Sequence, residues 1–145
     1  MRTLMLTLLL APVALAVAAP VPKELRNPPS LEGTWEVVTM HSLGQETTAY
    51  RGARWKIGKD AIGIDYPEAI RAQYPSVSNK INGVNRSASP KQLDYTNYQG
   101  TDRKAIYEVD GDKLTVCIPM QMTDRPKALA SDQTNLFYTF KRVKE

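Results

Sequence analysis

The sequence predicts an all-β fold, an up-and-down antiparallel β-barrel of about eight strands with a short helix in a mid-chain insertion. This prediction rests on residues 31–38 and residues 137–143, which both have the pattern of extended strands. In the first stretch, Leu31, Trp35 and Val37 fall on one face of the chain. A sheet whose first and last strands are its most strongly patterned ones is a candidate for closure into a barrel.

The remaining strands follow from alternation and turn signals. We expect strands at residues 33–41, 45–50, 54–57, 61–66, 92–98, 104–109, 113–118 and 135–143. The clearest hairpin turns at Asp110, Gly111 and Asp112, because Asp-Gly tolerates the positive φ of a tight reversal.

Alternation fades over residues 67–90. Residues 67–74 predict about two helical turns that end at Pro75, and a short strand is expected around Val84. We interpret this insertion either as a lid over one mouth of the barrel or as an ordinary variable insertion.

Residues 1–18 are expected to be a signal peptide, because Arg2, an apolar run and the small residues Ala16 and Ala18 follow in the required order. Residues 19–30 are expected to form a proline-rich tether, and residues 31–145 are expected to form the barrel domain. The apolar run is short for a membrane span and contains Pro12. The protein is therefore expected to be exported, periplasmic or secreted, with no membrane span once the leader is removed.

A length of 145 residues suits one domain with a real core. Cys117 is the only cysteine, so packing must stabilise the fold without an internal disulfide. Its strand-like surroundings favour a small half-buried side chain over a reactive thiol. Removing Arg2 from the 19 basic residues leaves 18 against 15 acidic ones, and these charges are scattered, so no nucleic-acid partner is expected.

Three pieces of the chain carry a resemblance. They are residues 31–38, residues 106–117 with the Asp-Gly-Asp turn and Cys117, and Arg125-Pro126 followed by residues 136–144. Together they resemble the planctomycete lipocalin-like domain family, a group of uncharacterised exported bacterial proteins. Residues 89–94 look like that family's lysine-proline-lysine motif, with Ser89 in the first position, whereas residues 66–87 depart from the family.

The resemblance implies a barrel similar to those of lipocalins and fatty-acid-binding proteins. In such folds a glycine-x-tryptophan lies near the first strand, and a basic residue of the last strand covers the indole. Gly33, Trp35 and Arg142 stand at matching positions, while Lys141 faces the opposite way from Arg142. These three residues are expected to close one end of the barrel and not to bind a ligand.

The sequence offers few side chains that could act in catalysis. His41 is the only imidazole, which excludes a multi-histidine metal site, and no nucleophile elbow, phosphate loop or paired-histidine motif is present. Asp60, Asp110 and Asp112 lie in expected turns, where a calcium site is a weaker interpretation than backbone hydrogen bonding. We expect no catalytic residue, no metal and no cofactor, and an enzyme is the least favoured class.

Two functions stay open. In one, the barrel holds a small apolar or amphipathic ligand against Tyr95, Tyr107, Tyr138 and Phe140. In the other, side chains fill a non-catalytic scaffold whose surface binds a cell-envelope protein. The loop over residues 119–132 is the candidate surface, with Met120 and Met122 as pliable contacts and Arg125 either touching the partner or anchoring the loop to backbone carbonyls. A monomer is expected.

Overall fold

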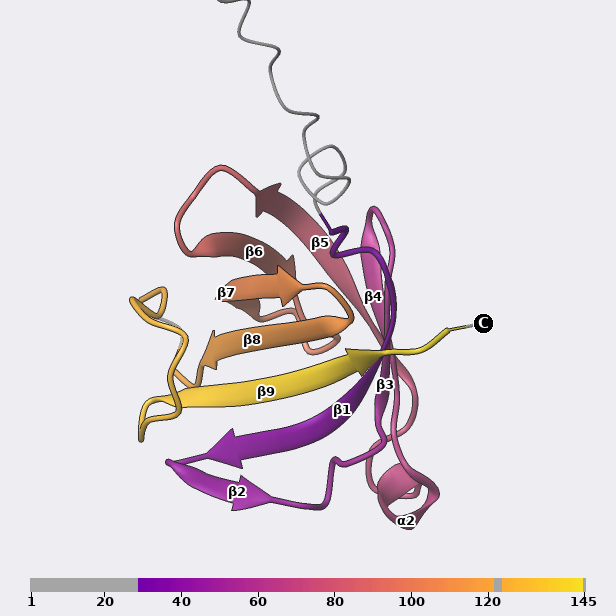
Figure 1. Cartoon of the computed structure of the whole chain (residues 1–145). Helices are drawn as coiled ribbons and strands as arrows, with labels where there is room; N and C mark the ends of the chain where they lie inside the picture. Colours follow the sequence, from indigo (N-terminus) through magenta and orange to yellow (C-terminus); the bar gives the residue numbers. More distant parts are fainter. Residues whose placement is uncertain (1–28, 122–123, 145) are drawn as a thin grey trace, which may run out of the picture.

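The described chain is almost entirely β-structure. The structure, a computed structural model, describes residues 29–121 and 124–144 (Figure 1). Its strands are β1 (Gly33–Ser42), β2 (Gln45–Thr47), β3 (Arg54–Ile57), β4 (Ala61–Asp65), β5 (Val77–Asn85), β6 (Lys91–Thr96), β7 (Asp102–Asp110), β8 (Lys113–Pro119) and β9 (Asn135–Arg142), and one short helix is α2 (Glu68–Arg71).

Eight of these strands close an antiparallel barrel, and β2 is an additional short strand. The hydrogen-bonded order is β2-β1-β3-β4-β5-β6-β7-β8-β9, and β1 also pairs with β9. One side of β1 serves two neighbours, because its first residues pair with β3 and its last residues with β2. The predicted all-β barrel is confirmed, and Figure 1 shows β1 running beside β9.

The core lies inside the barrel, where inward side chains of neighbouring strands meet in rows. One row joins Arg142, Trp35 and Trp55 across β9, β1 and β3. A second row joins Val37 and Phe140 across β1 and β9. Trp35, Val37 and Phe140 are all buried, so the strand periodicity expected from the sequence places the largest apolar groups in the interior.

One end of the barrel, which we call the closed end, is sealed by a contact between β1 and β9. The guanidinium carbon of Arg142 lies 4.0 Å from the centroid of the Trp35 ring, a cation–π contact. Arg142 also donates hydrogen bonds to the carbonyls of Ser30 and Glu32 at 2.8 and 3.1 Å. Trp35 Nε1 donates to the Leu31 carbonyl at 2.8 Å. Residues 30–32 are thereby held across this end.

Gly33 provides the space for Arg142. Its φ is +137°, and a Cβ atom at this position would lie 2.6 Å from Arg142 Nη1. Lys141 points to the outer surface, as the sequence predicts, and its Nζ lies 2.9 Å from Glu36 Oε1. This contact lowers the pKa of Glu36. The two neighbouring cations of β9 therefore have different roles. Arg142 packs on Trp35 at the closed end, and Lys141 pairs with Glu36 on the outer surface.

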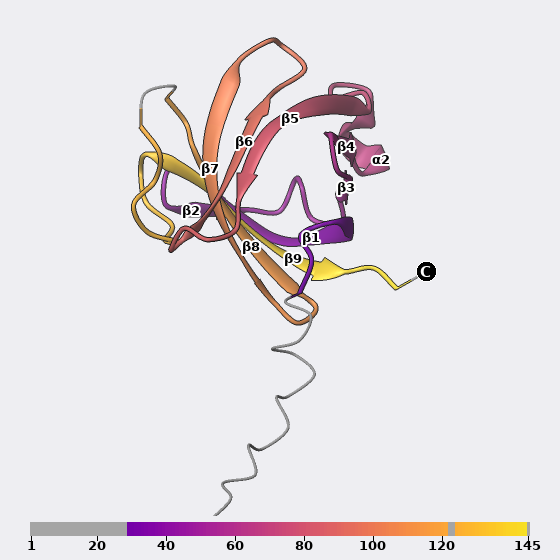
Figure 2. The ribbon, with the colours of Figure 1, turned by 90° about the horizontal axis from the view of Figure 1, so that it is seen from above.

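The opposite end, which we call the loop end, carries the longer connections. Because the strands alternate in direction, the β1–β2 turn, α2, the β6–β7 turn and the β8–β9 connection all lie there. Figures 1 and 2 show α2 and the β8–β9 connection on opposite sides of the molecule. The loop end thus presents two separate surfaces.

The middle of the chain differs from its sequence-based description. β5 extends over Val77–Asn85, where the sequence predicts only a short strand around Val84. Pairing with β4 and β6 on its two sides fixes this strand, although its own pattern is polar. β2 is shorter than expected, because turn hydrogen bonds from Arg51 N to Thr48 O and from Ala53 N to Tyr50 O follow it. Helix α2 is one turn long instead of two. Residues 67–90 therefore contribute a strand to the barrel wall.

The expected signal peptide and most of the expected tether lie outside the described residues. Within residues 29–121 and 124–144, no helix has the length and apolar character that crossing a membrane requires.

We predict that Gly33→Ala lowers the free energy of unfolding by about 1–3 kcal/mol. Alanine would have to adopt the disfavoured φ of this position, and its Cβ would displace Arg142 from the Trp35 ring. Urea unfolding monitored by tryptophan fluorescence measures this cost. Gly83→Ala is the matched control, since Gly83 has no atom within 4 Å of an added Cβ. It should change stability by no more than about 0.5 kcal/mol. If both variants lost the same free energy of unfolding, the closed end would not depend on the close contact between residue 33 and Arg142.

Candidate functional site

The four residues proposed to line a ligand cavity are all in the barrel interior, and they fill it. Tyr95, Tyr107, Tyr138 and Phe140 are between 1 % and 8 % exposed. The Trp55 ring lies 5.3 Å from that of Tyr138 and 5.0 Å from that of Phe140. Tyr138 and Phe140 stack at 5.7 Å. These distances are direct ring contacts, so Trp55, Tyr138 and Phe140 pack against one another instead of surrounding an open space.

Burial also fixes the protonation of the interior tyrosines. Desolvation raises the pKa of both Tyr95 and Tyr138 far above the usual value, so both phenols stay neutral. Tyr107, whose pKa burial also raises, borders a small surface cavity of about 270 Å³ beside Ser89 and Pro90.

A larger cavity lies outside the barrel interior, under the connection between β8 and β9. Its volume is about 680 Å³, within the usual range of ligand pockets. We call it the loop pocket. Its lining is Leu43, Pro119, Met120, Gln121, Asp124, Arg125, Pro126, Lys127, Ala128, Asp132, Gln133, Thr134 and Asn135. The acidic and basic side chains among these residues are equal in number, so the pocket has no net charge.

Hydrogen bonds hold the base of this connection against the barrel. Met120 N donates to Thr134 O at 2.9 Å, which joins the two ends of the connection. Arg103 Nη1 on β7 donates to the carbonyls of Pro119 and Met120, both at 3.2 Å. The walls of the loop pocket are thus supported by the sheet below.

Arg125 anchors the loop. Its Nη1 donates to the Ala105 carbonyl of β7 at 2.8 Å. Its Nη2 lies 2.7 Å from Asp94 Oδ1 of β6 as an ion pair, although no guanidinium N–H points along this approach. The structure therefore supports the anchoring interpretation of Arg125, and neighbouring Pro126 is buried in the pocket wall. Met122 lies outside the described residues.

Asp132 organises the last turn of the same connection. Its carboxylate accepts hydrogen bonds from the Thr134 hydroxyl and amide and from Asn135 Nδ2. The Thr134 hydrogen bonds lower the pKa of Asp132, so this carboxylate stays ionised and is used by the turn.

Leu43 stands at the rim of the loop pocket in an unusual conformation. It is the first residue of a two-residue turn between the paired residues Ser42 and Gln45, and its φ is +54°. Turns with positive φ at both central positions favour Asn-Gly, and a leucine there is strained. Leu43 is nevertheless 59 % exposed. An apolar side chain is held in strain at the surface, beside the apolar pocket walls formed by Pro119, Met120 and Pro126.

His41 and Cys117 lie on the same outer face of the sheet, on either side of Phe137. Both pair with Phe137 across β1, β9 and β8, so they are two strand spacings apart, about 10 Å. The His41 ring meets the Phe137 ring edge-on at 6.0 Å. Cys117 is fully buried rather than half-buried, with Sγ 3.7 Å from the Ala130 carbonyl. The two residues are too far apart to act as a nucleophile and its base.

The turn between β7 and β8 has a structural role. Gly111 takes a φ of +57°, as the Asp110-Gly111-Asp112 pattern predicts. The Asp112 carbonyl accepts a hydrogen bond from Arg142 N of β9 at 2.8 Å, and its carboxylate forms an ion pair with Lys144, just beyond that strand, at 2.9 Å. In the part of the chain that the structure describes, no three His, Cys, Asp or Glu side chains gather as metal ligands would.

A cluster of tyrosines at the loop end is not predicted from the sequence. Tyr50 follows β2, Tyr66 follows β4, Tyr74 follows α2 and Tyr98 lies in the β6–β7 turn. The rings of Tyr50, Tyr66 and Tyr74 lie 5.5–6.1 Å apart, and Tyr98, at the same end of the barrel, is 55 % exposed. We call these four residues the tyrosine mouth. The only sequence signal is an excess of tyrosine, seven against two phenylalanines.

Scans against protein-family models, curated proteins and solved structures found no match to this chain. The resemblance to planctomycete lipocalin-like proteins therefore stays a prediction.

We predict that the stability of the protein falls as the pH rises from about 8 to 10.5, in part through Cys117. Burial raises the pKa of the Cys117 thiol from 9.0 to about 11. Between these values the unfolded chain binds fewer protons than the folded one, so the free energy of unfolding decreases. The stability difference between wild type and Cys117→Ala should shrink by about 2 kcal/mol over this range. Parallel pH curves would mean that the thiol titrates as if exposed.

We predict that Arg125→Gln loosens the β8–β9 connection while the barrel stays folded. Losing a hydrogen bond from a charged donor is worth about 1.5–3 kcal/mol, which corresponds to at least about tenfold more local opening. Trypsin cleavage after Lys127 should accelerate accordingly. Arg51→Gln is the control, because it removes an exposed ion pair with Glu46 and should leave this rate unchanged. An unchanged rate in Arg125→Gln would remove Arg125 as the anchor.

Proposed function

We propose that this chain is a non-catalytic binding protein whose filled barrel is a scaffold, and that its loop pocket receives an apolar group from a cell-envelope protein. The observation that carries the proposal is Leu43, an exposed leucine held at positive φ on the rim of a cavity. Strained residues persist where the surrounding structure compensates for them, and they cluster at binding sites.

The filled interior supports a surface function over a ligand carried inside. A ligand in the barrel would have to displace the packed rings of Trp55, Tyr138 and Phe140, whose mutual contacts form part of the core. Removing such contacts destabilises a protein by several kcal/mol, about 3–5 for a large aromatic group. The loop pocket requires no such loss.

The chemistry of the loop pocket suits an uncharged apolar group. Its walls include Leu43, Met120, Pro126 and Ala128, and its charged residues balance. Asp132 and Arg125 are already engaged by Thr134, Ala105 and Asp94, so the polar groups define the shape of the pocket. A side chain such as Leu, Ile or Phe on the partner fits this environment.

We predict that Leu43→Asn separates binding from stability. Asparagine is favoured at positive φ, so the variant should be as stable as wild type or up to about 1 kcal/mol more stable. It should nevertheless lose the partner, because the apolar rim of the loop pocket is gone. A photo-crosslinking amino acid at Gln133, in the pocket lining, should capture a discrete partner in cells when Leu43 is present, and at least about tenfold less in the Leu43→Asn background.

The same crosslinker at Val38, exposed on β1 and outside the loop pocket, is the positional control and should capture nothing discrete. Equal capture in the wild-type and Leu43→Asn backgrounds would contradict the proposal. So would native mass spectrometry of wild type and Leu43→Asn if both retained the same small molecule, since that result would show a carried ligand whose binding does not need Leu43. If Leu43→Asn were less stable than wild type, Leu43 would not be strained in the native turn.

A further inference from the structure

One stretch of the barrel wall has a neighbouring strand on one side only. β5 pairs with β6 as far as Asn85, but its pairing with β4 ends at Lys80. A hydrogen bond from Ile81 N to Asp60 O at 2.9 Å extends this contact by one residue. Within the described chain, residues 82–85 of β5 are exposed and have no strand beside them on the β4 side. Their backbone forms a free sheet edge.

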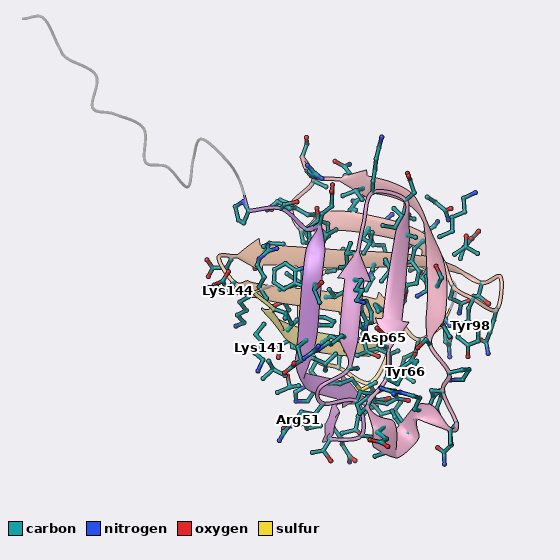
Figure 3. All side chains as sticks on the ribbon, turned by 90° about the vertical axis from the view of Figure 1, so that its right-hand side faces the viewer. Arg51, Asp65, Tyr66, Tyr98, Lys141 and Lys144 are labelled. Carbon is teal, nitrogen blue, oxygen red and sulfur yellow. The ribbon has the colours of Figure 1, made fainter. Side chains whose placement is uncertain are left out.

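A cavity of about 310 Å³ lies along this free edge, and we call it the edge groove. It is lined by residues 31–32 before β1, by residues 57–60 around the β3–β4 turn, and by residues 81–84 and 86. Figure 1 shows the chain before β1 entering between β4 and the end of β5. Figure 3 shows Asp65 and Tyr66 at the end of β4 that is remote from the β3–β4 turn, so the edge groove and the tyrosine mouth lie at opposite ends of this face.

Gly83 keeps the middle of the edge open. A Cβ atom added at Gly83 would meet no atom within 4 Å. The pairing of β5 with β6 is irregular between Ile81 and Gly83, but the φ of Gly83 is not positive, so this irregularity does not itself require a glycine. A glycine inside a strand often marks a place where another backbone approaches closely.

The lining of the edge groove suits a neutral peptide segment. Its two acidic and two basic residues cancel, and two of them are already paired, with Arg86 Nη2 3.5 Å from Glu32 Oε1. Among the described residues, no aromatic side chain lines the groove, so it offers no surface on which a nucleic-acid base could stack. Its apolar side chains are Leu31, Ile57, Ile81 and Val84.

The free edge itself indicates the chemistry of the occupant. The N–H and C=O groups along a strand edge pair with another extended backbone. Sites of this kind gain affinity from main-chain hydrogen bonds and select side chains with pockets beside the edge. The edge groove has both parts, because its apolar hollow adjoins the unpaired stretch of β5. Residues 57–60 wall the hollow, so it suits a single extended segment better than the flat sheet edge of a second copy.

We propose that the edge groove binds an extended segment of a partner protein, which adds a strand beside residues 82–85 of β5. One apolar side chain of that segment enters the hollow lined by Ile57 and Val84. The edge groove shares no lining residue with the loop pocket, so either proposal can fail without the other.

The test is fluorescence anisotropy with the purified protein and a labelled six-residue peptide of alternating threonine and valine. We expect saturable binding. Two versions of the peptide, each N-methylated at one of the two sets of alternate amides, keep every side chain but lose the N–H groups on one edge. At least one version should bind about tenfold more weakly, because the N–H groups that face β5 are gone. This comparison uses the wild-type protein throughout.

A pair of variants locates the binding. Val84→Asp places a charge in the edge groove and should weaken binding of the peptide about tenfold. Val38→Asp is the matched control, because Val38 on β1 is also an exposed valine and lies outside the groove, and it should bind as wild type does. Circular dichroism checks that both variants are folded.

Several results would overturn the proposal. They are absence of saturable binding, equal binding of all three peptides, and undiminished binding by folded Val84→Asp. A dimer of the wild type that dissociates in Val84→Asp, measured by sedimentation, would assign the edge to a second copy. If deleting residues 1–28, which precede every described strand, raises the peptide affinity about tenfold, the chain's own segment occupies the groove and the partner assignment is wrong.

Discussion

The barrel depends on the contact of Arg142 with Trp35, because it joins the first and last strands of the closed sheet. A closed sheet has no free edge, so the pairing of β1 with β9 decides whether the other strands form a barrel or an open ribbon. The contact combines a buried indole, a cation over its face and two carbonyls that accept from the same guanidinium. Gly33 leaves room for this arrangement, because a Cβ there would lie 2.6 Å from Arg142 Nη1.

This constraint explains why the first and last strands, β1 and β9, could be predicted well from the sequence. Residues near Trp35 and Arg142 must be buried on alternate positions, and their alternation is visible in the chain. β5 must only complete the hydrogen bonding between β4 and β6, and its exposed positions leave a polar pattern. Periodicity detects strands that bury a face, so β5 was the strand it described least well.

The candidate surfaces were less predictable, for a different reason. The sequence placed Tyr95, Tyr107, Tyr138 and Phe140 in the interior correctly, but inward direction does not determine whether side chains leave a cavity or fill it. The tyrosine mouth comes from four separate connections, and the loop pocket joins Leu43 to residues of the distant β8–β9 connection. No local pattern contains such a juxtaposition. Only the closure of the sheet creates it.

The two ends of the barrel therefore differ in what their residues contribute. At the closed end, Arg142 packs on the Trp35 ring in the space left by Gly33. A substitution there is expected to change the stability of the barrel. At the loop end, Leu43 is strained and exposed, and Tyr74 and Tyr98 are partly exposed. Such features lower stability or solubility where they stand. The loop pocket therefore lies at the end of the barrel away from the Trp35–Arg142 contact, where a substitution can change binding without acting on that contact.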